Sequence, residues 1–199
     1  MKKFVAETLL KLKNNLLNLK LGKIIDWWPL LLGPGIFFVV YISYHLNPTA
    51  SCWVVNKSRL ENIALVLTSA ATIAYIARAF ISKRFIFTFL AVLSGAFLCR
   101  EIHFTGTSVG IYIALVALAL WGIYKQDEIF ENLSKGCFLQ WLVSTVFVYF
   151  LGVLMARRAL KFLPLEHDLH VAFEEMLEDG AHLMLFITAF SDLFKFRKK

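Results

Sequence analysis

Cysteine, charged residues and nucleotide-binding signatures are all scarce in this chain. Its 199 residues include three cysteines without a C-x-x-C pair, so neither a disulfide framework nor a thiolate metal site is expected. The sequence contains no H-E-x-x-H, P-loop or dinucleotide fingerprint, which argues against the enzyme classes built on those motifs. Charged residues make up only 18% of the chain, against about 25% in an ordinary soluble domain. This shortage of charge points to a membrane protein.

Apolar residues are correspondingly abundant. They make up 59% of the chain, against roughly 45–50% in soluble domains, and they are grouped in blocks near the roughly 20 residues that a spanning helix needs. The net charge of +7 fits topogenic Lys and Arg and attraction to anionic lipids. Zinc-finger spacing and RNA-binding signatures are absent from the sequence. We therefore expect a lipid bilayer with anionic lipids as the partner, not nucleic acid, and a homo-oligomer is compatible with this class.

The hydrophobic pattern predicts an all-α fold, a polytopic membrane helical bundle of about six transmembrane helices. A Lys-rich amphipathic segment, residues 1–25, is expected to lie at the cytoplasmic interface. The bundle occupies residues 26–192, and a basic cytoplasmic tail occupies 193–199. The six expected spans are 28–45, 62–81, 85–104, 108–124, 137–155 and 170–190. A polar loop is expected between the fourth and fifth spans, over residues 125–135.

The distribution of Lys and Arg predicts the orientation. With the N-terminus inside, fifteen of these residues fall on the cytoplasmic side and six on the other side. The bias favours a multi-pass protein with both termini in the cytoplasm, in the inner or plasma membrane if the source is bacterial. In a five-span alternative the sixth stretch lies on the surface, which would leave the basic tail outside.

The beginning of the sixth expected span is unusually polar. The acidic stripe is the set of ionisable residues that leads into it: His167, Asp168, His170, Glu174, Glu175, Glu178, Asp179 and His182. On a helix of 3.6 residues per turn, all of these fall within about half the circumference. A charge at bilayer depth costs roughly 2.5–3.5 kcal/mol, so it normally faces protein or a wet cavity. The acidic stripe is therefore the predicted functional site.

One prediction for this site is a divalent metal. The pairs at i,i+4 spacing on the sixth span place ligands on adjacent turns, and the end of the third span can add others from a second helix. The predicted ligands are Glu101, His103, His170, Glu174, Glu178 and His182. Imidazole together with carboxylate suits Zn, Fe or Mn. Four carboxylates beside the imidazoles argue against haem.

Proton or cation translocation without a fixed metal is a second prediction, because carboxylates and histidines at membrane depth form proton relays. In this hypothesis Arg100 neutralises excess acid by forming an ion pair. Transporter-like binding of a proton or divalent cation is the leading function. A membrane-embedded metal-dependent hydrolase or transferase acting on a lipid is the alternative, with Glu175 or Asp179 as candidate general base. In the third alternative, ion pairs only hold the helices of a structural or assembly subunit together.

Overall fold

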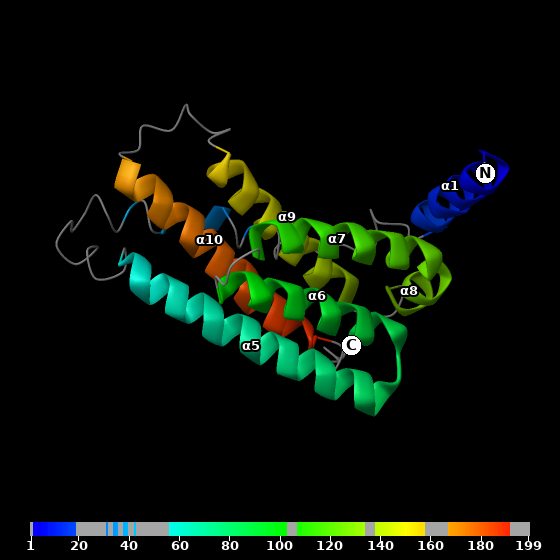
Figure 1. The fold of residues 1–199 in the computed structure, drawn as a ribbon, viewed down its shortest axis with the longest axis horizontal. Coiled ribbons are helices and arrows are strands. Elements are labelled where there is room, and N and C mark those ends of the chain that lie inside the picture. The colour runs from blue at the N-terminus through cyan, green and yellow to red at the C-terminus, as the bar shows by residue number, and fades with distance from the viewer. Residues whose placement is uncertain are drawn as a thin grey trace, which may run out of the picture.

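The structure is a computed structural model that describes residues 2–18, 56–102, 107–133, 138–157 and 167–191, with a few isolated positions between 31 and 42. Within these residues there are seven helices and no strand, and 93% of the residues are helical. The helices are α1 (Lys2–Asn18), α5 (Lys57–Ser82), α6 (Phe85–Glu101), α7 (Thr107–Tyr124), α8 (Gln126–Leu133), α9 (Phe138–Ala156) and α10 (His167–Thr188) (Figure 1). The all-α prediction is confirmed.

Helices α5 and α6 form an antiparallel hairpin with a very short connection. Helix α5 ends where Lys83 adopts the left-handed conformation, with φ of 52°. The backbone N–H of Lys83 donates to the carbonyl of Ala79 at 3.0 Å, which satisfies one of the carbonyls that a helix end leaves unpaired. Arg84 is then extended and begins α6. This tight turn brings the whole length of α6 alongside α5.

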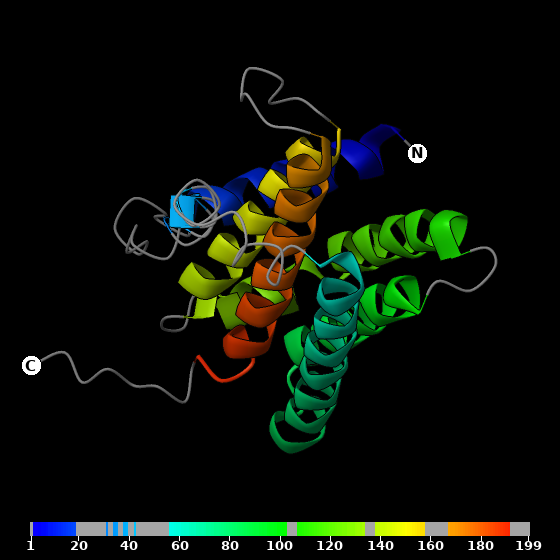
Figure 2. The same ribbon diagram turned by 90° about the vertical axis from the view of Figure 1, so that its left-hand side faces the viewer.

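Helix α10 lies between α9 and α5, as the view turned by 90° shows (Figure 2). Its apolar side chains join two buried clusters. One cluster includes Tyr75, Phe87 and Leu185, and the Tyr75 hydroxyl donates to the Leu185 carbonyl at 2.9 Å. The other cluster includes Val148 of α9 and Leu177 of α10. The polar helix of the sequence is thus held at the centre of the fold by its apolar half.

Small and hydroxylated residues allow these helices to pack closely. A Cβ atom built on Gly152 of α9 would lie 3.7 Å from Cγ of Glu178. The hydroxyls of Thr145 and Thr188 are 3.2 Å apart across the same interface. Each also donates to a carbonyl one turn earlier in its own helix, at 2.8 and 2.7 Å. These buried hydroxyls are therefore satisfied without water.

Two of the described helices are long and apolar enough to cross a bilayer, Ser58–Ser82 and Phe138–Ala156, and Val109–Tyr124 is a shorter apolar helix. The outward face of α7 is apolar as well, with Val109 and Ile113 64% and 65% exposed. These features fit a membrane-associated protein. Helix α10 is not among the two long apolar helices, because it carries five acidic residues.

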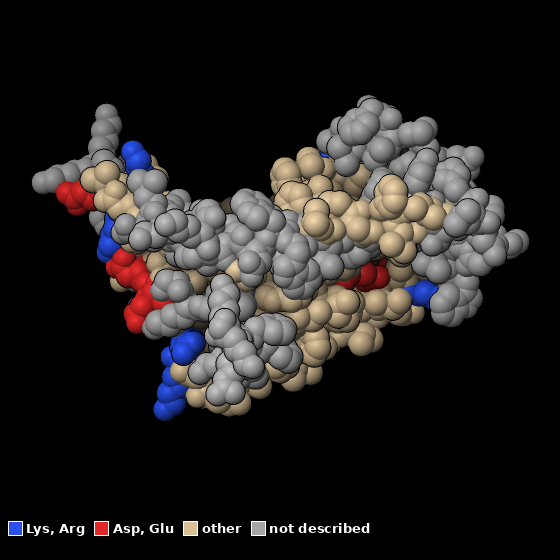
Figure 3. All heavy atoms as spheres, turned by 180° about the vertical axis from the view of Figure 1, so that it is seen from behind, with Lys and Arg blue, Asp and Glu red and all other residues tan. Residues whose placement is uncertain are grey.

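One predicted element, the loop over 125–135, differs in the structure, and another, the span 28–45, is mostly not described. The predicted loop over 125–135 was wrong, because Gln126–Leu133 forms the amphipathic helix α8, which packs Ile129 and Phe130 against the core. The N-terminal segment is helical over Lys2–Asn18, whereas the expected span 28–45 lies mostly outside the described residues. Seen from behind, charged side chains gather mainly at one end of the molecule, and toward the other end one acidic patch is recessed among uncharged side chains (Figure 3).

Candidate functional site

The acidic stripe lies on α10, where it faces neighbouring helices over part of its length. Residues Glu174, Glu178 and His182 follow one another at i,i+4 spacing on a single face. Their burial increases along the helix: Glu174 is half-buried, the Glu178 side chain is 15% exposed, and the His182 side chain is 1% exposed. The polar face therefore runs from accessible residues into the core.

The end of α6 meets this face. Because α6 runs antiparallel to α10, Arg100 comes level with Glu178, and its guanidinium donates to the Glu178 carboxylate at 3.1 Å. The Arg100 side chain is 40% exposed and that of Glu178 is 15% exposed. The pair therefore sits at the border between the core and the outer surface. This is the ion pair with the acidic stripe that the sequence predicted for Arg100.

Glu101 and His182 meet one layer deeper. Oε1 of Glu101 is 3.8 Å from Nε2 of His182, and the two side chains are 7% and 1% exposed. This separation is too long for a hydrogen bond. Within the described part of the chain, Nε2 of His182 has no hydrogen-bond partner. An imidazole nitrogen thus faces a carboxylate across a short gap that excludes bulk water.

The other ring nitrogen of His182 is occupied by α9. The hydroxyl of Tyr149 is 2.7 Å from Nδ1 of His182. When the hydroxyl donates this bond, the ring proton lies on Nε2 and is directed at Glu101. Tyr149 is in turn stacked on Phe97 of α6, with ring centroids 5.0 Å apart. Phe97 also contacts the imidazole, at 6.3 Å between centroids. The His182 ring is therefore fixed between an aromatic wall and a carboxylate.

The site residues occupy different positions along their helices, because Glu101 ends α6 while Tyr149 is near the centre of α9. Tyr149 is two residues past the midpoint of α9, a displacement of about 3 Å along the helix axis. Because α9 and α10 are antiparallel and Gly152 is opposite Glu178, the end of α9 is level with about Glu174. The first turns of α10 therefore extend past the end of α9.

The two candidate general bases lie on a neighbouring face of α10. Glu175 and Asp179 are both half-buried. Oδ1 of Asp179 is buried and, among the residues that the structure describes, has no hydrogen-bond partner. Neither residue is among those that line the cavity described below, so the structure does not bring the two candidate bases to it.

Two of the six predicted metal ligands, Glu101 and His182, face each other, and a third, Glu178, is held by Arg100. His103 lies outside the described residues, and only the backbone of His170 is described. Within the described ranges, no group of three His, Cys, Asp or Glu side chains could hold a metal ion. The metal prediction depends on residues that the structure does not describe.

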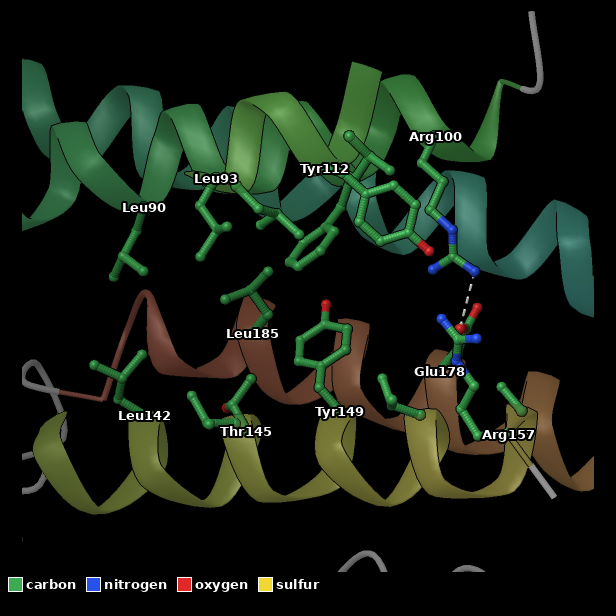
Figure 4. Close-up of a pocket in the computed structure, with 16 residues that line it drawn as sticks. Leu90, Leu93, Arg100, Tyr112, Leu142, Thr145, Tyr149, Arg157, Glu178 and Leu185 are labelled. Atoms are coloured by element: carbon green, nitrogen blue, oxygen red, sulfur yellow. Dashed lines mark hydrogen bonds and ion pairs between the residues drawn. The ribbon is translucent and has the colours of Figure 1, made fainter. Parts of the chain in front are cut away.

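A cavity of about 460 Å³ adjoins the site. Its walls come from α6, α7 and α9, and α10 contributes Glu178 and Leu185 (Figure 4). Tyr149 lines the cavity while its hydroxyl contacts His182. Arg100 and Arg157 line the same end. The hydrogen bond between Tyr149 and His182 therefore connects the cavity to the interior, where His182 faces Glu101.

Tyr149 is the residue that sequence reasoning missed. It stands in a mostly apolar helix, and a tyrosine there is also typical of ordinary core packing. Only the register of α9 against α10 distinguishes a packing role for Tyr149 from a hydrogen bond to His182, and the sequence does not give that register. Comparison of the chain with known protein families, curated proteins and solved structures gives no match.

Proposed function

We propose that this chain is an integral membrane protein that binds a proton at Glu101 and His182 and couples its binding to the occupancy of the adjoining cavity, as a carrier does. The proposed bundle has six spans with both termini in the cytoplasm, so the site opens to the outer side. The charge bias of the sequence supports this orientation. The pairing of the end of α6 with the acidic half of α10 supports a common level for the site residues.

The observation that carries the proposal is the environment of His182. Its side chain is 1% exposed, its Nδ1 is engaged by Tyr149, and its Nε2 faces Glu101 at 3.8 Å. A buried polar atom without a partner is costly, by about 1–3 kcal/mol. A proton shared between Nε2 and the Glu101 carboxylate, after a small approach of the two side chains, removes that cost and creates a charge-assisted hydrogen bond.

Tyr149 gives the site its connection to the cavity. A proton that arrives at the Tyr149 hydroxyl allows that hydroxyl to pass its own proton to Nδ1 of His182. The imidazole then releases the Nε2 proton to Glu101, so that one proton enters and one is transferred at each step. Glu178 lines the same cavity while it is paired with Arg100. An occupant that separates Arg100 from Glu178 would therefore change the charge close to Tyr149 and His182.

A proton is favoured over a divalent metal because two facing ligands are fewer than a metal centre requires. Zn, Fe or Mn enters this proposal only if His103 or His170 completes the set. Metal analysis of the purified protein distinguishes the two versions. A stoichiometric metal in the wild type that is lost in Glu101→Gln and in His182→Gln would establish the metal site and replace the proton-only version.

One observation favours the lipid-acting enzyme as a second candidate: the mostly apolar cavity reaches Tyr149. The candidate bases Glu175 and Asp179 are not among its lining residues, which is why the carrier is proposed first. Release of a labelled product from phospholipid, abolished by Asp179→Asn or Glu175→Gln, would reverse this order.

The carrier is tested by proton flux into proteoliposomes under an imposed membrane potential. Wild-type protein should move protons, and Glu101→Gln or His182→Gln should lower the rate at least tenfold, because either change removes a proton-binding atom. Glu131→Gln, an exposed acid on α8, is the matched control and should leave the flux unchanged. Equal rates for all four proteins, or no flux above that of empty liposomes, would contradict the proposal and favour a structural role for the ion pairs.

A further inference from the structure

The cavity beside the site is strongly asymmetric along its length. Most of its lining is apolar, with Leu90 and Leu93 of α6, Ile111 and Leu115 of α7, and Leu142 of α9. Its volume of about 460 Å³ is within the range of roughly 300–1,000 Å³ typical of small-molecule sites. A space of this size and character fits a flexible hydrocarbon chain and not a folded partner.

The charged groups of the cavity lie at one end. Arg100 of α6 and Arg157, which directly follows α9, line that end together with Glu178 (Figure 4). Glu178 balances the charge of Arg100 at 3.1 Å, whereas Arg157 has no ion-pair partner among the described residues, so its guanidinium is available at this end. Tyr112 lies beside Arg100 (Figure 4). Guanidinium groups bind phosphate oxygens by paired hydrogen bonds, which makes this end suited to a phosphate group.

The position of this end fits a lipid headgroup. Arg100 is the penultimate residue of α6, and Arg157 comes one residue after the end of α9. In a spanning bundle, helix ends lie at the level of the headgroups while the helix interiors lie in hydrocarbon. The wall residue Val146 of α9 is 61% exposed, so the apolar part of the cavity is accessible from the side of the bundle.

We infer that the cavity binds one anionic phospholipid, with an acyl chain between α6, α7 and α9 and its phosphate at Arg157 and Arg100. The inference rests on the membrane embedding that belongs to the proposed function, and it does not rest on proton binding. An anionic lipid is then the occupant of the cavity that Tyr149 lines. A lipid without net charge would leave the charge of Arg157 unbalanced.

The test uses full-length protein in nanodiscs with equal amounts of phosphatidylglycerol and phosphatidylcholine that carry the same acyl chains. Lipids that remain bound after release into mild detergent are counted by native mass spectrometry. Wild-type protein should retain one phosphatidylglycerol with a preference of about tenfold over phosphatidylcholine, the factor expected for one additional charge-assisted contact. Arg157→Gln should bring the preference close to parity. Arg84→Gln, an exposed arginine at the opposite end of α6, should leave it unchanged.

A second pair of variants tests the acyl-chain part of the cavity. Val146 lines the cavity, whereas Val116 of α7 is not among the lining residues, and both are 61% exposed. Val146→Trp should fill the space and abolish retention of both lipids, and Val116→Trp should not. No preference in the wild type, equal effects of the two arginine variants, or full retention in Val146→Trp would overturn the inference.

These outcomes are separable from failure of the proposed function. A protein that leaves membranes in an alkaline wash without detergent is not embedded, and that result would refute both proposals. A protein that needs detergent for extraction and conducts protons, but retains no anionic lipid, would refute the lipid site alone.

Discussion

Removing the Tyr149 hydroxyl is the most informative single perturbation of the site. Tyr149→Phe deletes the oxygen that lies 2.7 Å from Nδ1 of His182. The ring can keep its stacking on Phe97, 5.0 Å away, so the aromatic wall stays in place. His182 is 1% exposed, and its Nδ1 would be left without a protein partner or bulk water. A buried polar atom left unpaired in this way costs about 1–3 kcal/mol.

The free energy of unfolding in mixed detergent micelles is the appropriate measurement. Tyr149→Phe should lower it by about 1–3 kcal/mol, and Tyr124→Phe, at a side chain that is 77% exposed, should lower it by less than about 0.5 kcal/mol. In the double variant Tyr149→Phe, His182→Leu, part of the loss should be recovered, because neither polar partner remains. Equal small effects of the two tyrosine variants would refute the idea that this hydrogen bond holds the imidazole.

Three further predictions concern the ion pairs and the helix hairpin. Breaking the Arg100–Glu178 pair by Arg100→Met should destabilise the protein by about 1–2 kcal/mol. This is below the roughly 3–5 kcal/mol of a fully buried pair, because Arg100 is 40% exposed. A double-mutant cycle with Glu178→Gln measures the coupling energy, and a value near zero would contradict the pairing. Lys83→Gly should stabilise the hairpin by up to about 1 kcal/mol, because glycine accepts the positive φ of 52° without the steric cost that lysine bears, and unchanged or reduced thermal stability would count against this. The hydrogen bond from Lys11 lowers the pKa of Asp127. The α1–α8 contact should therefore be present at neutral pH and lost in acid as the pH falls through that lowered pKa. Hydrogen exchange of α1 in wild type and in Asp127→Asn measures the contact, and protection of α1 that does not change with pH would refute the prediction.

Much of the helical framework follows from hydropathy alone. The four expected spans over 62–81, 85–104, 108–124 and 137–155 correspond to α5, α6, α7 and α9, with ends that differ by a few residues. Long apolar blocks bounded by charge leave few other solutions for a chain of this composition. The helix α8 was missed because eight residues with five polar side chains resemble a loop unless Ile129 and Phe130 have a surface to pack on.

The site was predictable in its charges and not in its contacts. The acids and histidines of α10 and the matching Arg100 at the end of α6 were evident, because charges in so apolar a chain need partners. That Glu101 rather than Glu178 faces His182, and that Tyr149 comes from α9, depends on helix register and rotation. Those follow from close approaches such as Gly152 against Glu178, which only the folded structure gives.

The protonation of the His182 side chain in lipid bilayers tests the central claim most directly. Nitrogen-15 NMR of labelled histidine, assigned by the loss of one signal in His182→Gln, reports on Nδ1 and Nε2 separately. The proposed site predicts that Nδ1 keeps its hydrogen bond while Nε2 changes its proton sharing with pH, and that Glu101→Gln abolishes this change. A single neutral tautomer at every pH, unaffected by Glu101→Gln, would contradict proton binding at this site.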